Sequence, residues 1–411
     1  REHDIESALG DALGPETAAA LRSAGSHQRR ALRWLAGEDA RRVDPHADRK
    51  GLVQRFVLAD LFFATGGGEE RWDDRLNFLS DAHECDWNVK AATEQVADQT
   101  ECSFDWCVSR VYESPGFVYD FVGVKCLGDN STVDTVRIYN NGLEGSLPSE
   151  IGGLDSLEYI SLWKNKISGT IPSAAGKLTS LRALYLQRNR IGGAIPTALG
   201  RLVNLKDLSL KNNAIVGPFP SSLSTLKQLE WLTINSNRLN STLPRAISDM
   251  TSLAFLGLSN NSLSGPIPTE IASLQRLQTV SLAQNAFTST IPTEIGGMAG
   301  LQYLGLFANR LSGHIPSELG RIRRLGEVAL YDNLLTGTIP SQLGDVGETL
   351  EAVALFSNRL SGSIPSEIGR LSSLRRLYLG FSGLSGALPL EMANMTALEG
   401  LALDGNDFRG R

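Results

Sequence analysis

One stretch of sequence, residues 157–172 (LEYISLWKNKISGTIP), recurs with small changes along most of the chain. Its last residue marks a 24-residue period in Pro148, Pro172, Pro196, Pro220, Pro244, Pro268, Pro292, Pro316 and Pro340, followed by Pro365 one place late and by Pro389 in the regular period again. An asparagine stands seven places before the proline position at Asn141, Asn165, Asn189, Asn213, Asn237, Asn261, Asn285, Asn309, Asn333, Asn358 and Asn406. A fixed period of this length indicates a repeat architecture.

The apolar positions of one repeat predict its structure. Ile160 and Leu162 alternate with polar neighbours, which predicts a short strand. Asn165 can bond backbone groups that a sharp turn leaves unpaired, and Gly169 permits a positive φ. After the proline, apolar residues recur every third place, which suits a 3₁₀ segment. Because one coil cannot bury its own leucines, the coils must stack into a solenoid.

Four positions depart from this pattern. Gly347 is the extra residue in the one lengthened interval, and we expect it to bulge harmlessly on the return side of its coil. Ser241 and Ser289 replace the turn glycine. Ser382 replaces the asparagine, which should loosen one turn.

The motif L-x-x-L-x-L-x-x-N-x-L-x-G-x-I-P resembles the plant-type leucine-rich repeat of receptor-kinase ectodomains and enzyme-inhibitor proteins. The resemblance covers residues 133–411, with about twelve repeats whose strands run from Val136–Tyr139 to Leu401–Asp404. It implies an α/β repeat solenoid, a leucine-rich-repeat superhelix with a parallel concave β-sheet and a 3₁₀-rich convex side. Solenoids need polar end caps, and because none is visible after the last repeat, we expect a missing cap or a partner at that end.

Residues 69–132 carry all four cysteines and are a predicted N-terminal cap. Trp72, Cys85–Trp87 and Val122–Cys126 resemble the W and C-x-W-x-G-V-x-C elements of plant-type caps. This resemblance implies a disulfide between Cys85 and Cys126, with Cys102–Cys107 as the second pair. Spacing alone leaves three connectivities open. A four-cysteine zinc site is the alternative, although paired C-x₂-C spacing is absent.

Residues 1–68 are predicted to be a helical, juxtamembrane segment. Arg29–Gly37 and Leu52–Thr65 have the pattern of short amphipathic helices, and the second is too short and too charged to span a membrane. The region resembles the part before the repeats in leucine-rich-repeat proteins of diatoms and related algae, which implies a possible membrane anchor upstream of residue 1. We expect residues 1–28, rich in Ala and Gly, to be loosely held.

Composition and missing motifs exclude several function classes. The 411 residues are 42% hydrophobic and 20% charged, and the net charge of −6 argues against nucleic acid as a partner. No G-K-[ST] follows Gly66–Gly68, and H-E-x-x-H, G-x-S-x-G and EF-hand motifs are absent. His83 is predicted to be an ordinary surface histidine, and Glu327 and Asp332 a solvated pair of carboxylates. We therefore predict no enzyme, no cofactor and no metal site.

Strand side chains alternate, so residues two, four and six places before each asparagine should point to the concave face. Twelve aromatic residues fall on or beside this face: Tyr139, Tyr159, Trp163, Tyr185, Trp231, Phe255, Tyr303, Phe307, Tyr331, Phe356, Tyr378 and Phe381. Packing within the sheet is the plainer explanation, but an exposed aromatic run is typical of interfaces. We predict that a protein, peptide or glycan binds there.

These features together predict a non-catalytic recognition module, an extracellular receptor-like or adhesion ectodomain from the secretory pathway. One alternative is a structural subunit held within a larger assembly. Another, by family analogy alone, is an inhibitor of a secreted glycan-degrading enzyme. The sequons at Asn130, Asn240, Asn260 and Asn394 are candidate glycosylation sites, although their number is close to chance.

Overall fold

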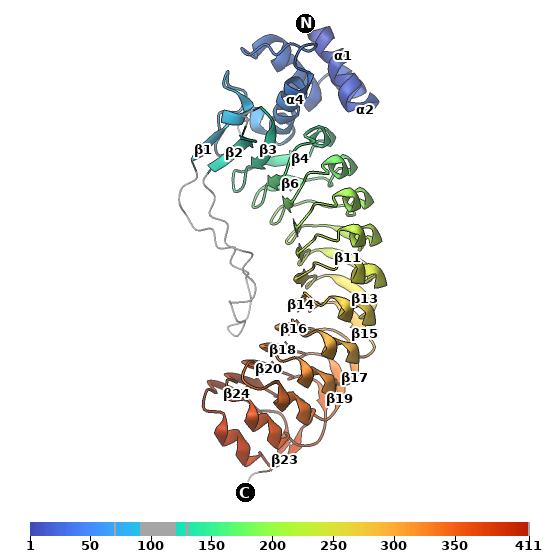
Figure 1. Ribbon diagram of the computed structural model, residues 1–411, viewed down its shortest axis with the longest axis vertical. Coiled ribbons are helices and arrows are strands. Elements are labelled where there is room, and N and C mark those ends of the chain that lie inside the picture. The colour runs from blue at the N-terminus through green and yellow to red at the C-terminus, as the bar shows by residue number, and fades with distance from the viewer. Residues whose placement is uncertain (70, 91–120, 129–130, 410–411) are drawn as a thin grey trace. The chain divides into compact units, whose positions relative to one another are not determined.

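The computed structural model describes residues 1–69, 71–90, 121–128 and 131–409 (Figure 1). The chain divides into two compact units, which we call unit 1 (Arg1–Ile215) and unit 2 (Val216–Arg411). Unit 1 contains the predicted segments 1–68 and 69–132 together with the first repeats, and unit 2 contains the later repeats.

Unit 1 begins with the helices α1 (Glu2–Leu13), α2 (Pro15–Arg22), α3 (His27–Arg33) and α4 (Arg49–Ala64), and a π-helical turn (Trp34–Glu38) continues α3. The expectation that residues 1–28 are loosely held is wrong, because Ile5, Leu9 and Leu21 are fully buried. Ile5 and Leu9 are four positions apart and therefore lie on one face of α1. The many alanines and glycines around them hide this apolar stripe in the sequence.

Helix α4 is buried on nearly every side, so its predicted amphipathic character is also wrong. Its buried residues run from Gly51 to Phe62 and include the charged Arg55 and Asp60. Asp48 caps the N-terminus, where its carboxylate accepts a hydrogen bond of 2.8 Å from the backbone N–H of Gly51. The two charges do not mark a solvent-facing side, because each has partners inside the protein.

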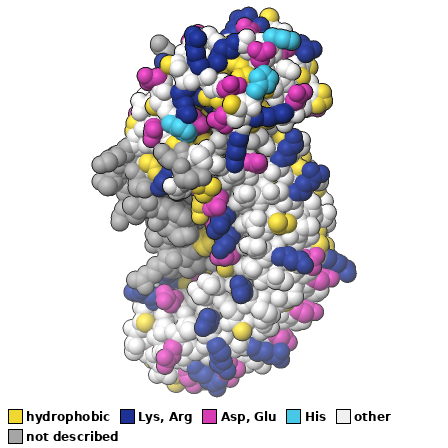
Figure 2. Space-filling model, turned by 45° about the horizontal axis from the view of Figure 1, so that its top comes forward, with side chains coloured by type: hydrophobic (Ala, Val, Ile, Leu, Met, Phe, Trp, Pro, Cys, Tyr) yellow, Lys and Arg dark blue, Asp and Glu magenta, His cyan; other side chains and the backbone are white. Residues whose placement is uncertain are grey.

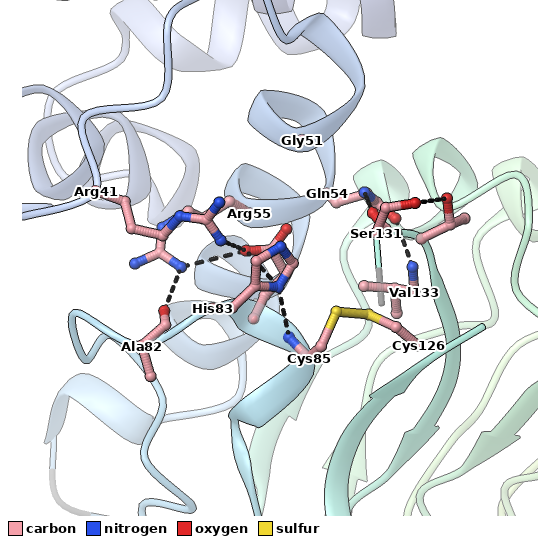
Figure 3. A network of polar contacts seen from close by, with 12 residues as sticks. Arg41, Gly51, Gln54, Arg55, Ala82, His83, Cys85, Cys126, Ser131 and Val133 are labelled. Carbon is pink, nitrogen blue, oxygen red and sulfur yellow. Dashed lines mark hydrogen bonds and ion pairs between the residues drawn. A yellow bond between two sulfur atoms is a disulfide. The ribbon is translucent and has the colours of Figure 1, made fainter. Parts of the chain in front are cut away.

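The buried guanidinium of Arg55 holds the cap together (Figure 3). It donates to both carboxylate oxygens of Asp39 at 2.9 and 2.8 Å and to Glu84 at 3.3 Å. Two backbone carbonyls accept further bonds at 3.0 and 2.8 Å. The rings of Trp34 and Trp87 lie 5.1 and 4.8 Å from the guanidinium carbon, within cation–π range. A charge so fully paired can be buried without a prohibitive desolvation cost.

The concave sheet of unit 1 follows the order β1 (Asn88–Lys90), β2 (Phe121–Cys126), β3 (Val133–Arg137), β5 (Tyr159–Ser161), β7 (Ala183–Tyr185) and β8 (Asp207–Ser209). β1, β2 and β3 pair antiparallel, and the pairs from β3 onward are parallel. The parallel register advances by one repeat from strand to strand, as in Thr135, Tyr159 and Ala183. The repeat period therefore sets the pairing.

Unit 2 continues the pattern with β10 (Trp231–Thr233), β12 (Phe255–Gly257), β14 (Thr279–Ser281), β16 (Tyr303–Gly305), β18 (Glu327–Ala329), β20 (Ala352–Ala354), β22 (Arg376–Tyr378) and β24 (Gly400–Ala402). Adjacent strands are parallel and in register, and Glu327 pairs with Ala352 across the one lengthened repeat. The predicted parallel concave sheet is confirmed in both units, with strand ends shifted by a few positions.

Short 3₁₀ helices lie on the opposite side of each coil from the concave strands (Figure 1). In unit 1 they are η4 (Ser149–Gly153), η5 (Ser173–Lys177) and η6 (Thr197–Arg201). In unit 2 they are η7 (Ser221–Thr225), η8 (Arg245–Asp249), η9 (Thr269–Ser273), η10 (Thr293–Gly297), η11 (Ser317–Arg321), η12 (Ser341–Val346), η13 (Ser366–Arg370) and η14 (Leu390–Asn394). Each follows directly on a repeat proline, and η12 is one residue longer and ends at Gly347 with φ +81°. The predicted bulge on the return side is thus confirmed.

Outer strands follow the turns of the coils. Unit 1 has β4 (Glu144–Ser146) paired with β6 (Lys166–Ser168). Unit 2 has three small sheets: β9 (Val216–Pro218), β11 (Arg238–Thr242), β13 (Ser262–Pro266) and β15 (Ala286–Thr288); β17 (Ser312–His314), β19 (Leu334–Gly337) and β21 (Arg359–Leu360); and β23 (Ser385–Gly386) with β25 (Asp407–Phe408).

The repeated asparagines bond backbone groups at the turns, as predicted, and they also join neighbouring coils. Asn189 donates through Nδ2 to the carbonyl of Leu162 in the preceding coil at 2.9 Å and to that of Leu186 in its own coil at 3.1 Å. Its Oδ1 accepts from the N–H of Ile167 at 3.0 Å. One buried side chain therefore satisfies three backbone groups that the turn would otherwise leave unpaired.

The residues that depart from the repeat pattern are accommodated without loss of the coil structure. Ser382 is fully buried, and its hydroxyl donates to the carbonyl of Leu355 in the preceding coil at 3.0 Å. A hydroxyl has one donor hydrogen where an amide has two, so the link to the preceding coil persists with fewer bonds. Ser241 and Ser289 adopt the left-handed φ of the glycines that they replace, at +80° and +68°. Their β-carbons strain these turns.

The disulfide Cys85–Cys126 joins the turn before β1 to the end of β2, with a Cα–Cα distance of 5.3 Å (Figure 3). It confirms the predicted pair. The alternative of a zinc site built from four cysteines is wrong, because two of those thiols are consumed by the bond. The second predicted pair, Cys102–Cys107, lies outside the described residues.

Candidate functional site

The concave face of unit 2 carries two stacks of aromatic rings. Phe307, Tyr331 and Phe356 belong to the column two places before the asparagines, and their rings stack at centroid distances of 4.4 and 4.3 Å. Trp231 and Phe255 belong to the column six places before, and they stack at 4.2 Å. Adjacent strands are about 4.8 Å apart, so rings in the same column of neighbouring coils meet face to face.

Unit 1 carries a smaller group of aromatic residues on its concave face. The rings of Tyr139 and Trp163 stack at 5.3 Å with an interplanar angle of 7°. The guanidinium of Arg137 lies 6.0 Å from the ring of Tyr159. Stacked aromatic residues therefore occur on the concave face of each unit.

The exposure of these rings differs from the prediction. Five of the twelve residues are buried: Trp163, Tyr185, Phe255, Tyr303 and Tyr331. Six are half-buried: Tyr139, Tyr159, Trp231, Phe307, Phe356 and Tyr378. Only Phe381 among them is exposed, at 62%. Stacking contributes to the burial of Trp163, Phe255 and Tyr331, because each of these rings covers a face of its neighbour. The role of the twelve residues in binding stays a prediction.

Small residues between the two aromatic columns are a feature that the sequence reasoning missed. The ring of Tyr303 lies along its own strand over Gly305, where a β-carbon would come within 2.4 Å of the tyrosine hydroxyl. Phe255 lies over Gly257 in the same way, at 3.0 Å. The sequence feature that could have indicated this is a glycine four places before Asn261 and before Asn309. A glycine there leaves room for a ring to lie flat on the sheet.

Glu327, in the column six places before the asparagines, is not part of a solvated pair. Its side chain is buried, whereas Asp332 is exposed in the following turn. Burial raises the pKa of Glu327 to about 7; the Arg376 charge opposes this rise and the Glu351 charge adds to it. The carboxylate oxygen Oε2 has no hydrogen-bond partner within the described part of the chain. Sequence position placed Glu327 on the inner face but could not show its burial.

A second titratable cluster lies in unit 1, where helices α2 to α4 meet η4. Nδ1 of His27 is 2.6 Å from the fully buried carboxylate of Asp60, and Thr17 and Gln28 donate to buried Glu150 at 2.9 and 3.3 Å. Burial raises the pKa of Asp60 to about 6, which His27 opposes. Burial alone would lower the pKa of His27, but the hydrogen bond and charge of Asp60 outweigh it and raise that pKa.

Comparison with known proteins identifies the repeats. Two leucine-rich-repeat family models match, one over residues 196–263 and the other over residues 156–178 and 180–202. This chain is a leucine-rich-repeat solenoid. A search of the curated proteins finds no match to it.

Solved structures similar to this solenoid include plant receptors. The plant peptide hormone receptor RGFR1 in complex with RGF2 is 34% identical, with a TM-score of 0.62, over 67% of this chain and 48% of that chain. The ectodomain of the Arabidopsis thaliana membrane receptor kinase GASSHO1/SCHENGEN3, in complex with CASPARIAN STRIP INTEGRITY FACTOR 2, is 33% identical, with a TM-score of 0.66, over 70% and 38%. A TDR receptor is 32% identical, with a TM-score of 0.66, over 68% and 49%. The solenoid spans less than half of each of these chains.

A cavity of about 500 Å³ lies in unit 1 of the solenoid, between the helices α1, α2 and α4 and the 3₁₀ helices η4 and η5. Leu13 and Val53 supply apolar surface, and Lys50, Lys177 and Asp155 supply charges. The mixed charges select no single class of ligand, and we assign the cavity no role.

His83 is half-buried rather than a plain surface residue. Its Nδ1 accepts a hydrogen bond of 3.2 Å from the N–H of Cys85 and lies 3.7 Å from a carboxylate oxygen of Glu84. His83 also lies close to the sulfurs of Cys85 and Cys126. Because those sulfurs form the disulfide, this group offers a metal one imidazole and no thiolate.

The surface of the solenoid gives further constraints. Basic and acidic side chains are interspersed on the face shown in Figure 2. Within the described ranges, every helix is too short or too polar to cross a bilayer. The sequons at Asn240, Asn260 and Asn394 are exposed, and Asn130 lies outside the described residues.

Proposed function

We propose that this solenoid is a non-catalytic recognition module that binds a peptide or protein on the concave face of unit 2. The observation that carries the proposal is the stack of Phe307, Tyr331 and Phe356, which stands on the concave side of a fold shared with solved peptide-hormone receptors. Aromatic anchors are the residues that most often dominate binding energy at protein interfaces. The other predicted aromatic residues of unit 2 would extend the same face.

The cellular setting is part of this proposal. The disulfide Cys85–Cys126 favours an oxidising compartment, and the exposed sequons are compatible with passage through the secretory pathway. Similarity to receptor ectodomains supports an extracellular location. The plant-type class of the repeats, the algal resemblance of the N-terminal region and a membrane anchor upstream of residue 1 belong to the same proposal.

The test begins with a random peptide library displayed on phage and selected on the wild-type protein. The affinities of the selected peptides are then measured for Phe356→Ala and for Leu390→Ala, which removes an apolar side chain from η14 that is 89% exposed. We expect Phe356→Ala to weaken binding about tenfold or more, since truncating a central aromatic anchor costs about 2 kcal/mol. Leu390→Ala should change little. Equal affinity for both variants would contradict the proposal.

A structural subunit within a larger assembly is the second candidate. Leu388, Leu390 and Leu401 are exposed in unit 2, and exposed apolar side chains favour a permanent partner. Size-exclusion chromatography with light scattering separates the two candidates, because a monodisperse monomer would speak against a subunit. A bound glycan and the enzyme-inhibitor role have no comparable observation in their favour.

A further inference from the structure

Glu327, on the aromatic concave face of unit 2, has a buried carboxylate oxygen that receives no hydrogen bond from the described residues. It is 5% exposed and begins β18, so its side chain shares the concave face with Ala329 and Tyr331. Its Oε2 is buried and lacks a hydrogen-bond donor among the residues that the structure describes. A buried carboxylate oxygen without a donor costs free energy, so its retention calls for a compensating ligand.

The surroundings of Glu327 form a niche. Tyr303 is its register partner on β16, and Ala352 is its partner on β20. The floor consists of the small side chains of Ala329, Ala352 and Ala354, each of which is buried. Tyr303, the three alanines and the stack that begins at Tyr331 border the carboxylate, and we call these surroundings the niche.

The charges around the niche favour a cation. Burial raises the pKa of Glu327 to about 7, because the opposing charge of Arg376 does not cancel this rise and the charge of Glu351 adds to it. Tyr331 is neutral at that pH, because burial raises its pKa further above its ordinary value of 10.0. Aromatic rings and a carboxylate both attract ammonium and guanidinium groups, and they repel anions.

We propose that Glu327 binds a cationic group of the peptide, either a Lys or Arg side chain or a free amino terminus, on the alanine floor of β18 and β20. This inference rests on the proposed peptide-binding function and adds that the concave face prefers peptides with a cationic group. It assigns Glu327 a direct contact with the ligand, in place of catalysis or a structural ion pair.

Binding of a cation should depend on pH in a defined direction. The cation binds the ionised carboxylate, so below pH 7 Glu327 must first lose a proton, and affinity should fall about tenfold per pH unit. The other charged or titratable groups that face the site are Arg376, Glu351, Tyr303 and Tyr331.

The experiment uses three synthetic heptapeptide pools. Two are acetylated and amidated, with either Lys or Gln fixed at the centre and no other Lys or Arg. The third has a free amino terminus and lacks Lys and Arg. Binding to the full chain is measured by fluorescence anisotropy at pH 6.0 and 8.0 for wild type, Glu327→Gln and Glu348→Gln. Glu348→Gln removes the same charge from an exposed site in the same repeat.

We expect either the Lys pool or the free-amine pool to bind wild type at least tenfold more tightly than the Gln pool. The pool that binds more tightly shows whether the cation is a side chain or an amino terminus. Glu327→Gln should abolish this preference and its pH dependence, whereas Glu348→Gln should keep both. Equal binding of all three pools, or a cation preference that survives Glu327→Gln, overturns the cation site but leaves peptide binding standing. Failure of every pool to bind wild type contradicts the proposed peptide-binding function itself.

Discussion

Replacement of Arg55 by Met should loosen the packing between helix α4 and the N-terminal cap. The side chain is fully buried, donates three hydrogen bonds to the carboxylates of Asp39 and Glu84, and lies beside two tryptophan rings. Methionine preserves much of the apolar stem but none of the donors. Two buried carboxylates would be left without their main partner.

The magnitude follows from these interactions. Breaking a buried ion pair by removing one partner costs about 3–5 kcal/mol, because the remaining charge is buried and uncompensated. Removal of each cation–π interaction adds about 1 kcal/mol. We expect the double variant Arg55→Met with Asp39→Asn to recover part of the loss, because it removes the charge that the single variant strands.

Local hydrogen exchange followed by mass spectrometry is the suitable assay, since the coils of a solenoid need not unfold as one cooperative unit. Amides of α4 should exchange about two to three orders of magnitude faster in Arg55→Met, whereas amides of β24 should be unchanged. The control is Arg41→Met, whose partly exposed side chain also contacts Glu84, at 3.3 Å. It should cost less than about 1 kcal/mol. Equal exchange of α4 in both variants would refute the assigned role of Arg55.

Three further predictions concern single substitutions, each checked by thermal or urea unfolding. Ser382→Asn should stabilise the solenoid by about 1 kcal/mol, because its amide oxygen can accept from the N–H of Leu360 as that of Asn358 accepts from Leu335, and an unchanged midpoint would contradict the ladder argument. Ser241→Gly should stabilise by about 0.5–1 kcal/mol, because glycine removes the strain at φ +80°, and a loss of stability would show that the turn is unstrained. The raised pKa of Asp60 means that the folded state binds its proton more tightly, so up to about 3 kcal/mol of stability present below pH 3.8 is lost as pH rises through about 6. Asp60→Asn should remove that loss, and a variant with the wild-type pH profile would exclude Asp60 as its cause.

The repeat could be predicted from the sequence because it depends on the properties of residues that are close together in the chain. Period, strand, turn asparagine and turn glycine each impose a backbone constraint, and the one-repeat register follows from stacking similar coils. Ser241 and Ser289 were recognisable as departures for the same reason. Their left-handed φ shows that the neighbouring coils fix the turn even where the residue does not favour it.

The burial of charged residues could not be predicted in this way. Arg55, Asp60 and Glu327 look like solvent-facing residues in sequence, because their partners are distant along the chain or are set by how the coils stack. Sequence placed the concave aromatic residues in columns but did not show that Tyr303 and Tyr331 would be buried. Side-chain burial on this face depends on neighbours one repeat away in the sequence. A pattern of residues within one repeat therefore cannot predict this burial.

Photo-cross-linking of a selected peptide tests the central claim most directly. A benzophenone side chain is placed at each position of the peptide in turn, and the attached residues of the protein are identified by mass spectrometry. Binding on the concave face predicts cross-links to residues of the strands β16 to β20 and to the column of Phe307, Tyr331 and Phe356. Cross-links confined to the 3₁₀ helices or to α1–α4 would contradict the account.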